Sequence, residues 1–479
     1  MLVVQLPSQE LLRASSIDGA TEIEFTSLIP RAQNPVIEPR CGSADWGPGG
    51  RSGNSDQSSP AVYPPANRSG PGRRGGGSEL PGSSLKVRAI MSVVYVHIGL
   101  PKTGTTHLQD RLWRNRDLAL RESGLLYPGN VIADHFHAAV HLQPERYLDW
   151  VDPAHANAWP QMVAQMKVWP QTSLVSHELL ATAKPAHIDA LLNDLSFADE
   201  VHVVATVRDL AKQLPSVWQE NVKNQRRASF EEFVASVRAH AIPGPGQPAP
   251  RELPNAAELA HADTPEEEPF WEFQDYVSIL GRWAEKVGPE RVHVVTVPRT
   301  RGVPGDGLWE RFLGVLGVDP APLDIPVPNL NVSLSAAQTE FLRALNLRLQ
   351  PDDIAWERYE RMIKGEVIGQ ILFRDQGGKA QGLSAPQRVW AGNQAAAMTA
   401  AVRSAGYSVT GDLADLGISG DAATETVTAS TQEVLDAALD TFATMIKTAP
   451  MPKTGPRVRT RAMNVVRRAR RRILGLRRT

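Results

Sequence analysis

The chain has 479 residues, which is enough for two or three ordinary domains, and its hydrophobic content of 42% is typical of a globular protein. The formal net charge of −1 excludes a chain that is strongly basic or acidic throughout. The single cysteine, Cys41, excludes an internal disulfide and favours a reducing compartment. No apolar run reaches the roughly 18 residues that a membrane span requires, and the N-terminus lacks the order of a signal peptide. We therefore expect a cytoplasmic protein.

The near-neutral total hides a strongly basic C-terminal tail. Residues 451–479 contain ten Arg, one Lys and no Asp or Glu, so the rest of the chain carries −12. The tail also contains Val465, Val466, Ile473 and Leu474 between its Arg residues. This mixture predicts either a peripheral contact with an anionic membrane, at the inner membrane face, or a disordered basic tail. We expect no specific nucleic-acid partner.

Residues 1–90 do not have the composition of a folded domain. Gly, Ser, Pro and Asn dominate between Gly42 and Gly77, and such a segment cannot bury enough apolar surface to offset its chain entropy. Met91 stands directly before the first strong strand pattern. Two interpretations are open: either Met91 is the physiological start of the protein, or residues 1–90 are a true disordered extension.

The first ordered stretch predicts a strand, a tight loop and a helix. The apolar run from Val93 to Ile98 is typical of a buried parallel strand, and a helical pattern continues to about Glu122. The loop between them has the sequence Gly-Leu-Pro-Lys-Thr-Gly-Thr-Thr and contains Pro101, Lys102, Thr103, Gly104, Thr105 and Thr106. Free amides at the start of the helix, a lysine and threonine hydroxyls together predict a site for a phosphate-like anion.

The position of the lysine separates this loop from the common nucleotide P-loop. In that pattern Lys follows the second Gly, whereas here Lys102 precedes Gly104. The order Pro-Lys-Thr-Gly-Thr-Thr resembles the phosphosulfate-binding loop of sulfotransferases that use 3′-phosphoadenosine 5′-phosphosulfate (PAPS). An ordinary Gly/Thr-rich turn is the alternative interpretation. Residues 406–413 also look like a segment of actinobacterial members of that family.

Strand and helix patterns alternate after this loop. We therefore expect an α/β fold whose parallel sheet is flanked by helices and carries a P-loop-like phosphosulfate-binding loop. Ligands in such sheets bind at the carboxyl ends of the strands. The expected further strands lie at 124–129, 172–176, 201–207 and 292–297, and the expected helices lie from 210, after Ser229, at 276–287 and at 308–316.

Arg208 and Ser216 form a second candidate anion site. Arg208 ends the strand at 201–207, and Ser216 follows eight residues later in an expected helix. Arg offers a planar set of donors to a phosphate, and Ser adds a short donor. The segment resembles the part of sulfotransferases that binds the 3′-phosphate of PAPS. Pairing of Arg208 with an acid such as Asp209, beside a solvated Ser216, is the structural alternative.

His177 and Glu178 follow the strand at 172–176, where the resemblance implies a general base. Sulfuryl transfer to an alcohol requires a base for the hydroxyl proton. The resemblance to bacterial members favours Glu178, with His177 orienting it or the acceptor, although Glu178 could instead be a helix-start carboxylate. His135 and His137 are expected to pack or to face solvent rather than to bind a metal. We assign no cofactor role to Asp306, which is expected to cap the helix at 308–316.

The remaining chain predicts a helical extension. Beyond 330 no further strand is expected, and residues 331–449 are predicted to form helices that pack on the α/β domain of residues 91–330. One of these helices follows Ser335, another spans about 386–403, and the last follows Ser430 with Leu435, Leu439, Phe442 and Ile446 as its apolar stripe. The Pro-rich segment 242–269 is expected to be a lid or a binding loop.

The resemblance as a whole implies an enzyme that transfers a sulfuryl group from PAPS to a hydroxyl or an amine. Lys102, Glu178 and His177 are the implied catalytic residues, and no metal is implied. The acceptor is a small molecule, a carbohydrate or a lipid. Two alternatives stay open, namely a non-catalytic nucleotide-binding or membrane-associated protein and a P-loop kinase. The kinase is disfavoured because the Gly-Lys-Ser/Thr order is absent from the loop.

Overall fold

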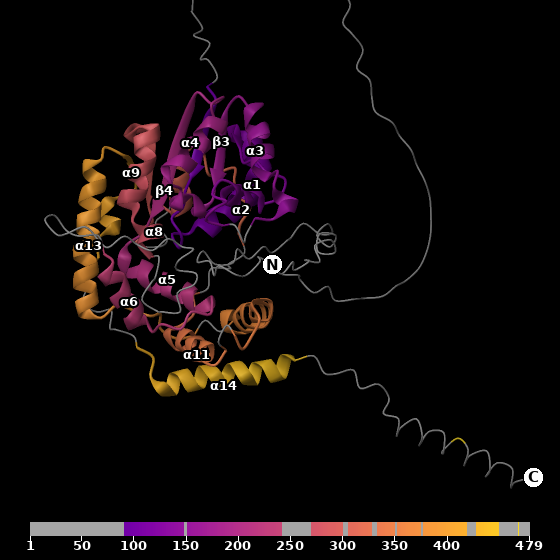
Figure 1. The fold of residues 1–479 in the computed structure, drawn as a ribbon, viewed down its shortest axis with the longest axis vertical. Helices are drawn as coiled ribbons and strands as arrows, with labels where there is room; N and C mark the ends of the chain where they lie inside the picture. The colour runs from indigo at the N-terminus through magenta and orange to yellow at the C-terminus, as the bar shows by residue number, and fades with distance from the viewer. Residues whose placement is uncertain are drawn as a thin grey trace, which may run out of the picture.

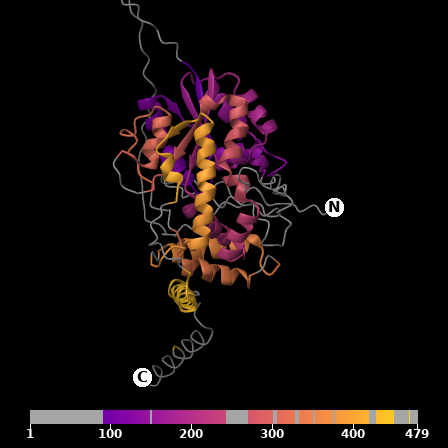
Figure 2. The same ribbon diagram turned by 90° about the vertical axis from the view of Figure 1, so that its left-hand side faces the viewer.

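The computed structural model describes residues 91–147, 151–241, 270–299, 305–327, 333–349, 352–374, 377–418 and 428–449, together with residue 468. The predictions for residues 1–90, for the loop 242–269 and for nearly all of the tail 450–479 lie outside the described residues. Figure 1 shows the arrangement of the elements, and Figure 2 shows it after a quarter turn.

The described strands form one six-stranded parallel sheet in the order β2-β3-β1-β4-β5-β6. β1 is central, and its Val93 lies in register with Thr172 of β3 on one side and Glu200 of β4 on the other. The expected parallel α/β sheet is thus confirmed. The strands are β1 Val93–His97, β2 Leu125–Leu126, β3 Thr172–Ser176, β4 Glu200–Val207, β5 Val292–Thr296 and β6 Ser408–Thr410.

β6 corrects the expectation that no strand follows residue 330. Its three residues pair with β5, with Val409 opposite Val294, so the extension adds the edge strand of the sheet. The segment is too short to show an apolar run or a period of two, and only its pairing with β5 makes it a strand.

Helices cover both faces of the sheet. The helices are α1 Thr105–Ser123, α2 Asp134–His141, α3 Ala158–Lys167, α4 Pro185–Asp194, α5 Leu210–Lys223, α6 Phe230–Ala239, α8 Phe270–Gln274, α9 Tyr276–Val287, α10 Leu308–Val315, α11 Ala336–Asn346, α12 Trp356–Tyr359, α13 Ala385–Ser404 and α14 Thr431–Thr448. A π-helix, η5 Glu360–Ile371, follows α12, and short 3₁₀ turns are η2 Pro153–His155, η3 Glu178–Thr182, η4 Pro289–Arg291, η6 Leu372–Arg374 and η7 Leu413–Leu416.

Two apolar clusters hold the layers together, one on each face of the sheet. On one face α1 and α10 pack through side chains such as Leu112 and Phe312. On the other face α2, α3, α4 and α9 pack on β1, β3 and β4 through side chains such as Met162 and Ile188. The chain after β1 therefore continues into a helix on one face of the sheet, whereas the chain after β3 and after β4 continues into helices on the opposite face. A crevice at the carboxyl ends of the central strands is expected where connections diverge in this way.

The helical extension lies mainly on α5 and α9. α13 contacts both helices, and Figure 2 shows it running from beside the sheet to the lower helices. The expected capping boxes at Ser229, Ser335 and Ser430 are present. The apolar stripe of α14, however, does not face the body: Leu435, Leu439, Phe442 and Ile446 are 49–64% exposed. The stripe is therefore not the side by which α14 meets the rest of the extension: α14 contacts α11 and η5, and its buried residue is Thr441.

Candidate functional site

The candidate site lies at the carboxyl edge of the sheet, where three neighbouring strands end. The loop after β1 leads into α1, η3 follows β3, and α5 follows β4 after two residues. Lys102, Glu178 and Arg208, which the sequence places after three separate strands, are brought to this one edge by the order β3-β1-β4. The three predicted site residues therefore follow strands that are direct neighbours in the sheet.

Side chains hold the carbonyl groups of the loop after β1. The Thr103 hydroxyl donates to the Leu100 carbonyl oxygen at 2.6 Å, and the Gln213 amide donates to the Pro101 carbonyl oxygen at 2.6 Å. Lys102 has a φ of +64° and Gly104 a φ of +102°, both in the left-handed region. No side chain of the described residues caps α1 at Gly104, so its first amides remain available to an anion, as expected for a free helix start.

The threonines of the loop differ in exposure. Thr103 and Thr105 are each 2% exposed, whereas Thr106 is exposed. The Thr103 hydroxyl lies 2.5 Å from that of Thr206 on β4, in addition to its bond within the loop. The Thr103 hydroxyl therefore bonds the loop to the sheet. Only the backbone amide of Thr103 can make its expected contact with an anion.

Lys102 forms an ion pair with Glu220 of α5. The Nζ–Oε2 distance is 2.9 Å, and the two side chains are 28% and 12% exposed. Burial opposes the ionisation of Glu220, but the charges of Lys102, Lys223 and Lys364 outweigh it and hold the pKa of this carboxyl well below its ordinary value. Glu220 is therefore a carboxylate that balances the charge of the loop lysine. Nothing in the loop motif indicated this residue.

Ser216 lies on the face of α5 that meets the loop. Gln213, Ser216 and Glu220 are spaced three and four residues apart, which places them on one side of a helix. Gln213 contacts Pro101 and Glu220 contacts Lys102, so the half-buried Ser216 lies between two residues that contact the loop. This spacing was the signal in the sequence that could have identified Gln213 and Glu220.

Arg208 contacts the loop directly. Its Nη1 donates to the carbonyl oxygen of Lys102 at 3.2 Å, and its side chain is partly buried. Asp209, its suggested acidic partner, caps α5 by accepting from the Lys212 amide at 3.0 Å. Arg208 and Ser216 thus both lie beside the loop, on the side of β4.

Glu178 lies against the loop from the side of β3. A Cβ atom added at Gly99 would lie 2.8 Å from the Glu178 Cβ, so only glycine permits this approach, and its φ of +95° also favours glycine. The Glu178 carboxylate accepts from the Gln109 amide of α1 at 2.9 Å and is 4% exposed. Gln109, which no motif indicated, therefore fixes the carboxylate beside the loop.

His177 has a different environment from its neighbour. Its Nδ1 accepts from the Leu179 amide at 3.2 Å, so the imidazole caps η3. Burial lowers the pKa of His177, while the nearby Glu178 opposes that shift. A neutral imidazole whose Nδ1 already accepts a hydrogen bond serves as a structural cap in this geometry.

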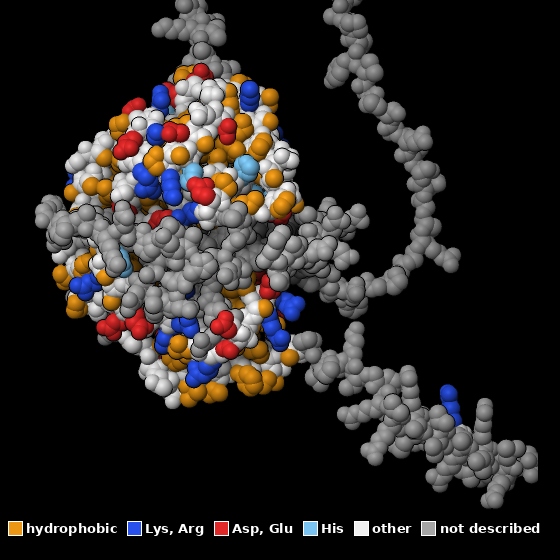
Figure 3. Space-filling view, in the orientation of Figure 1, with side chains coloured by type: hydrophobic (Ala, Val, Ile, Leu, Met, Phe, Trp, Pro, Cys, Tyr) orange, Lys and Arg blue, Asp and Glu red, His pale blue; other side chains and the backbone are white. Residues whose placement is uncertain are grey.

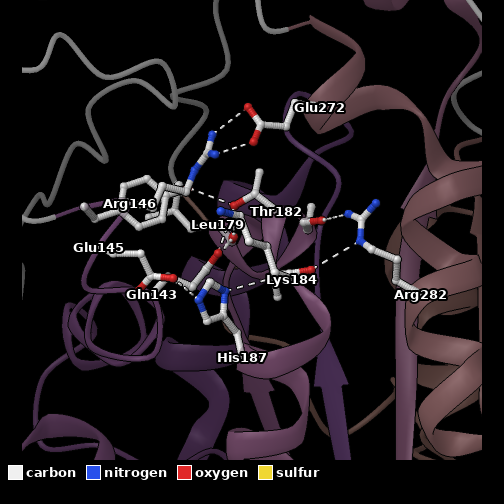
Figure 4. A network of polar contacts seen from close by, with 12 residues as sticks. Gln143, Glu145, Arg146, Leu179, Thr182, Lys184, His187, Glu272 and Arg282 are labelled. Carbon is white, nitrogen blue, oxygen red and sulfur yellow. Dashed lines mark hydrogen bonds and ion pairs between the residues drawn. The ribbon is translucent and has the colours of Figure 1, made fainter. Parts of the chain in front are cut away.

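A polar network holds η3 in place (Figure 4). Gln143, in the turn that follows α2, donates to the Leu179 carbonyl oxygen at 3.0 Å and accepts from the Thr182 hydroxyl at 3.1 Å. Arg282 of α9 donates to the Ala181 carbonyl oxygen at 3.1 Å. An ion pair between Arg146 and Glu272 joins the turn after α2 to α8 in the same network. These contacts fix the turn that begins with Glu178.

The other histidines near the site are packed. His135 is 2% exposed, stacks on Tyr127 with 4.2 Å between ring centroids, and accepts from the Ser176 amide at 3.3 Å. His137 stacks on His155 at 3.9 Å. Among the described residues, no group of three or more His, Cys, Asp or Glu side chains is arranged to hold a metal ion.

Asp306 does not cap α10, contrary to the expectation. Gly307 is the N-cap residue of α10 and supplies no side-chain cap, while the Asp306 carboxylate pairs with Arg311 at 2.6 Å. Arg311 also pairs with Asp415 of η7 and donates to the Thr296 carbonyl oxygen at 2.9 Å. Asp306 thus belongs to an ionic cluster that fastens the turn after β6 to the end of β5.

Comparison with known proteins gives no relative: no protein-family model, curated protein or solved structure matches the chain. No helix within the described part of the chain is both long and apolar enough to cross a membrane.

Proposed function

We propose that the protein is a sulfotransferase that moves a sulfuryl group from PAPS to a hydroxyl or amine of an acceptor. The observation that supports this proposal is the convergence of Lys102, Arg208 and Glu178 at one edge of the sheet, around a loop whose carbonyls are held by side chains. The sulfotransferase-like order of the loop supplies the choice of PAPS among phosphate-containing donors. The uncapped start of α1 adds free amides beside Lys102.

The residues present fit a donor that carries two separate anionic groups. The amides at the start of α1, together with Lys102, would hold the phosphosulfate, and Arg208 with Ser216 would hold the 3′-phosphate. Lys102 and Gly104 have left-handed backbone conformations, which are typical of loops whose amides converge on an anion. Glu220 is the one feature that does not fit an anion site ready for its ligand. The Lys102 side chain is paired with Glu220 and must break this pair before it can contact a ligand.

Glu178 is the proposed general base. It would take the proton of the acceptor hydroxyl while the acceptor oxygen bonds to sulfur and the bond from sulfur to the phosphate oxygen breaks. Lys102 would offset the negative charge that develops on that phosphate oxygen. Positioning by Gln109 and Gly99 keeps the carboxylate at the loop. His177 is assigned a positioning role through η3, since its Nδ1 accepts from a backbone amide.

A protein that binds a nucleotide without transferring a group is the second candidate. The Lys102–Glu220 pair favours it, because the only lysine of the loop is neutralised by a neighbouring carboxylate. A kinase is less well supported. The acid nearest the end of β4, Asp209, is engaged in capping α5 rather than directed toward a metal-bound phosphate.

Calorimetry with adenosine 3′,5′-bisphosphate and with ATP tests the class of ligand. Selective binding of the bisphosphate, weakened by Arg208→Ala and unchanged by the distant Arg348→Ala, is the expected result. Selective binding of ATP would instead favour a kinase. Transfer of radiolabelled sulfate from PAPS to a panel of carbohydrate, lipid and small-molecule acceptors then distinguishes an enzyme from a binding protein. Bisphosphate binding without transfer to any acceptor would favour the second candidate.

A further inference from the structure

The last described helix has an apolar stripe with no partner within the described residues. In α14 the side chains of Leu435, Leu439, Phe442 and Ile446 are 49%, 55%, 62% and 64% exposed. Their spacing of four, three and four residues puts them on one side of the helix. We call these four residues the α14 stripe. Exposed large side chains that share one helix face are typical of a contact surface rather than of scattered surface residues.

The stripe is distinct from the side by which α14 packs on the protein. Thr441 is 3% exposed, and the half-buried Met445 packs against the main core, while α14 as a whole contacts α11 and η5. Figure 1 places α14 at the lower edge of the body, and Figure 3 shows hydrophobic side chains along that edge. The stripe therefore faces outward from a helix that is fixed on its other side.

The charges near the stripe identify the kind of partner. The described residues of α14 include the acids Glu433, Asp436 and Asp440 and the single base Lys447. The segment 451–479, which begins three residues after α14 ends, contributes ten Arg and one Lys without an acid. The positive charges of this segment outnumber the acids of α14 several times, so the sequence that follows the stripe carries a large cationic surplus.

We propose that the α14 stripe docks on an anionic lipid surface, with the basic segment 451–479 supplying the electrostatic attraction. Stable peripheral binding requires two signals, and an exposed apolar helix face beside a polybasic segment provides both. Cations close to an anionic membrane attract it, and eleven of them outweigh the repulsion of three helix acids. A second copy of this chain fits the α14 stripe less well than a membrane does. A stable protein interface uses about 20 residues on each side, whereas the stripe has four. This proposal does not depend on the proposed enzymatic function.

Vesicle flotation with the full chain tests the proposal. Wild-type protein is expected to float with vesicles of phosphatidylglycerol and phosphatidylcholine, and not with phosphatidylcholine alone. Phe442→Asp is expected to reduce the bound fraction by about tenfold, because it puts a charge where an exposed aromatic side chain would contact lipid. Val389→Asp is the matched control, since Val389 is 66% exposed on α13, and it should bind as the wild type does. Circular dichroism and the melting temperature verify that both variants fold.

A second variant isolates the contribution of the tail. This variant replaces five arginines by glutamine, at Arg467, Arg468, Arg470, Arg471 and Arg472. Its binding to vesicles should fall to a similar extent as that of Phe442→Asp. Three results would overturn the proposal. The first is absence of wild-type flotation, and the second is equal flotation of Phe442→Asp and wild type, which would leave the stripe without a role. The third is concentration-dependent dimerisation that Phe442→Asp abolishes without vesicles, which would make a second copy the partner.

Discussion

The Lys102 ammonium lies 2.9 Å from the Glu220 carboxylate, so the lysine of the loop that would bind an anion already has a counter-charge on α5. Glu220 has a further cation, Lys223, at 3.7 Å, and Lys364 of η5 also lowers its pKa. Departure of Lys102 would therefore not leave Glu220 as an uncompensated buried charge. This arrangement allows Lys102 to exchange Glu220 for a bound anion, and it makes Glu220 a competitor of the ligand.

Replacing Glu220 by Gln should therefore tighten the binding of adenosine 3′,5′-bisphosphate. Removing a charge-assisted hydrogen bond that the ligand has to break is expected to increase affinity roughly five- to tenfold. Calorimetry measures this change. Glu340→Gln, which breaks the Glu340–Arg343 pair on α11, serves as the control and should leave affinity unchanged. Weaker binding by Glu220→Gln would mean that Glu220 shapes the loop rather than competing with the ligand.

Replacing Lys102 by Ala should abolish sulfuryl transfer and leave the fold intact. The loss of a cation aimed at developing negative charge is expected to reduce turnover by about 10² to 10³ or more. The fold should persist because Gln213 and Thr103 hold the loop independently of the lysine side chain. A sulfate-transfer assay and a melting curve measure the two effects, with Lys286→Ala as the control. Undiminished turnover would refute the role of Lys102.

Replacing Glu178 and replacing His177 should have different effects, the first on turnover and the second on stability. Glu178→Gln keeps the shape of the side chain but cannot take a proton, and it should reduce turnover by about 10² to 10⁴ with little change in bisphosphate affinity. His177→Ala removes the cap of η3 and should lower the unfolding free energy by about 1 kcal/mol. Turnover per folded molecule measures the difference. The opposite result, a large loss for His177→Ala only, would make His177 the base.

Gly99→Ala should disturb both the loop and the proposed base. The added Cβ would lie 2.8 Å from the Glu178 Cβ, and Ala would have to adopt a φ of +95°. We expect a loss of about 1–3 kcal/mol in unfolding free energy, accompanied by reduced turnover. Gly314→Ala on α10 is the control, because a Cβ there meets nothing within 4 Å, and it should be neutral or slightly stabilising. Equal stability of the two variants would contradict the close approach of Gly99 to Glu178.

Acid should destabilise the protein through its buried histidines. Burial, together with the nearby His177, lowers the pKa of both His97 and His135 to about 3, well below the ordinary value of a histidine. The unfolded chain therefore binds more protons than the folded one between about pH 6.5 and pH 3. In that window stability falls as the pH falls, by about 1.4 kcal/mol per pH unit for each histidine.

Urea unfolding at a series of pH values measures this slope. His97→Asn should reduce it by the contribution of one histidine, whether or not the variant is less stable overall. Val96→Ala, which removes buried apolar volume from β1 without changing a titratable group, is the comparison and should lower stability while leaving the slope unchanged. An unchanged slope for His97→Asn would mean that another group causes the acid sensitivity.

Much of the local structure follows from the sequence by itself. Apolar runs such as Val93–His97 and the Ser-x-x-Glu/Gln boxes at Ser229 and Ser335 act within a few residues, so each strand and cap is readable from its own segment. The order of residues in the loop around Lys102, and the positions of Glu178 and Arg208 directly after predicted strands, could also be recognised in the sequence. Because the strands are parallel, their carboxyl ends share one edge, and the gathering of these residues could be predicted.

The tertiary structure alone decided what these residues contact. The spacing on α5 places Glu220 on the same helix face as Ser216, but Glu220 becomes the partner of Lys102, 118 residues away in the chain, only because α5 packs beside the loop. Ser408–Thr410 is a strand only because β5 offers it an open edge. The stripe of α14 has the same amphipathic pattern as a buried helix face, yet it is exposed, because periodicity determines that a helix has an apolar side but not which surface covers it.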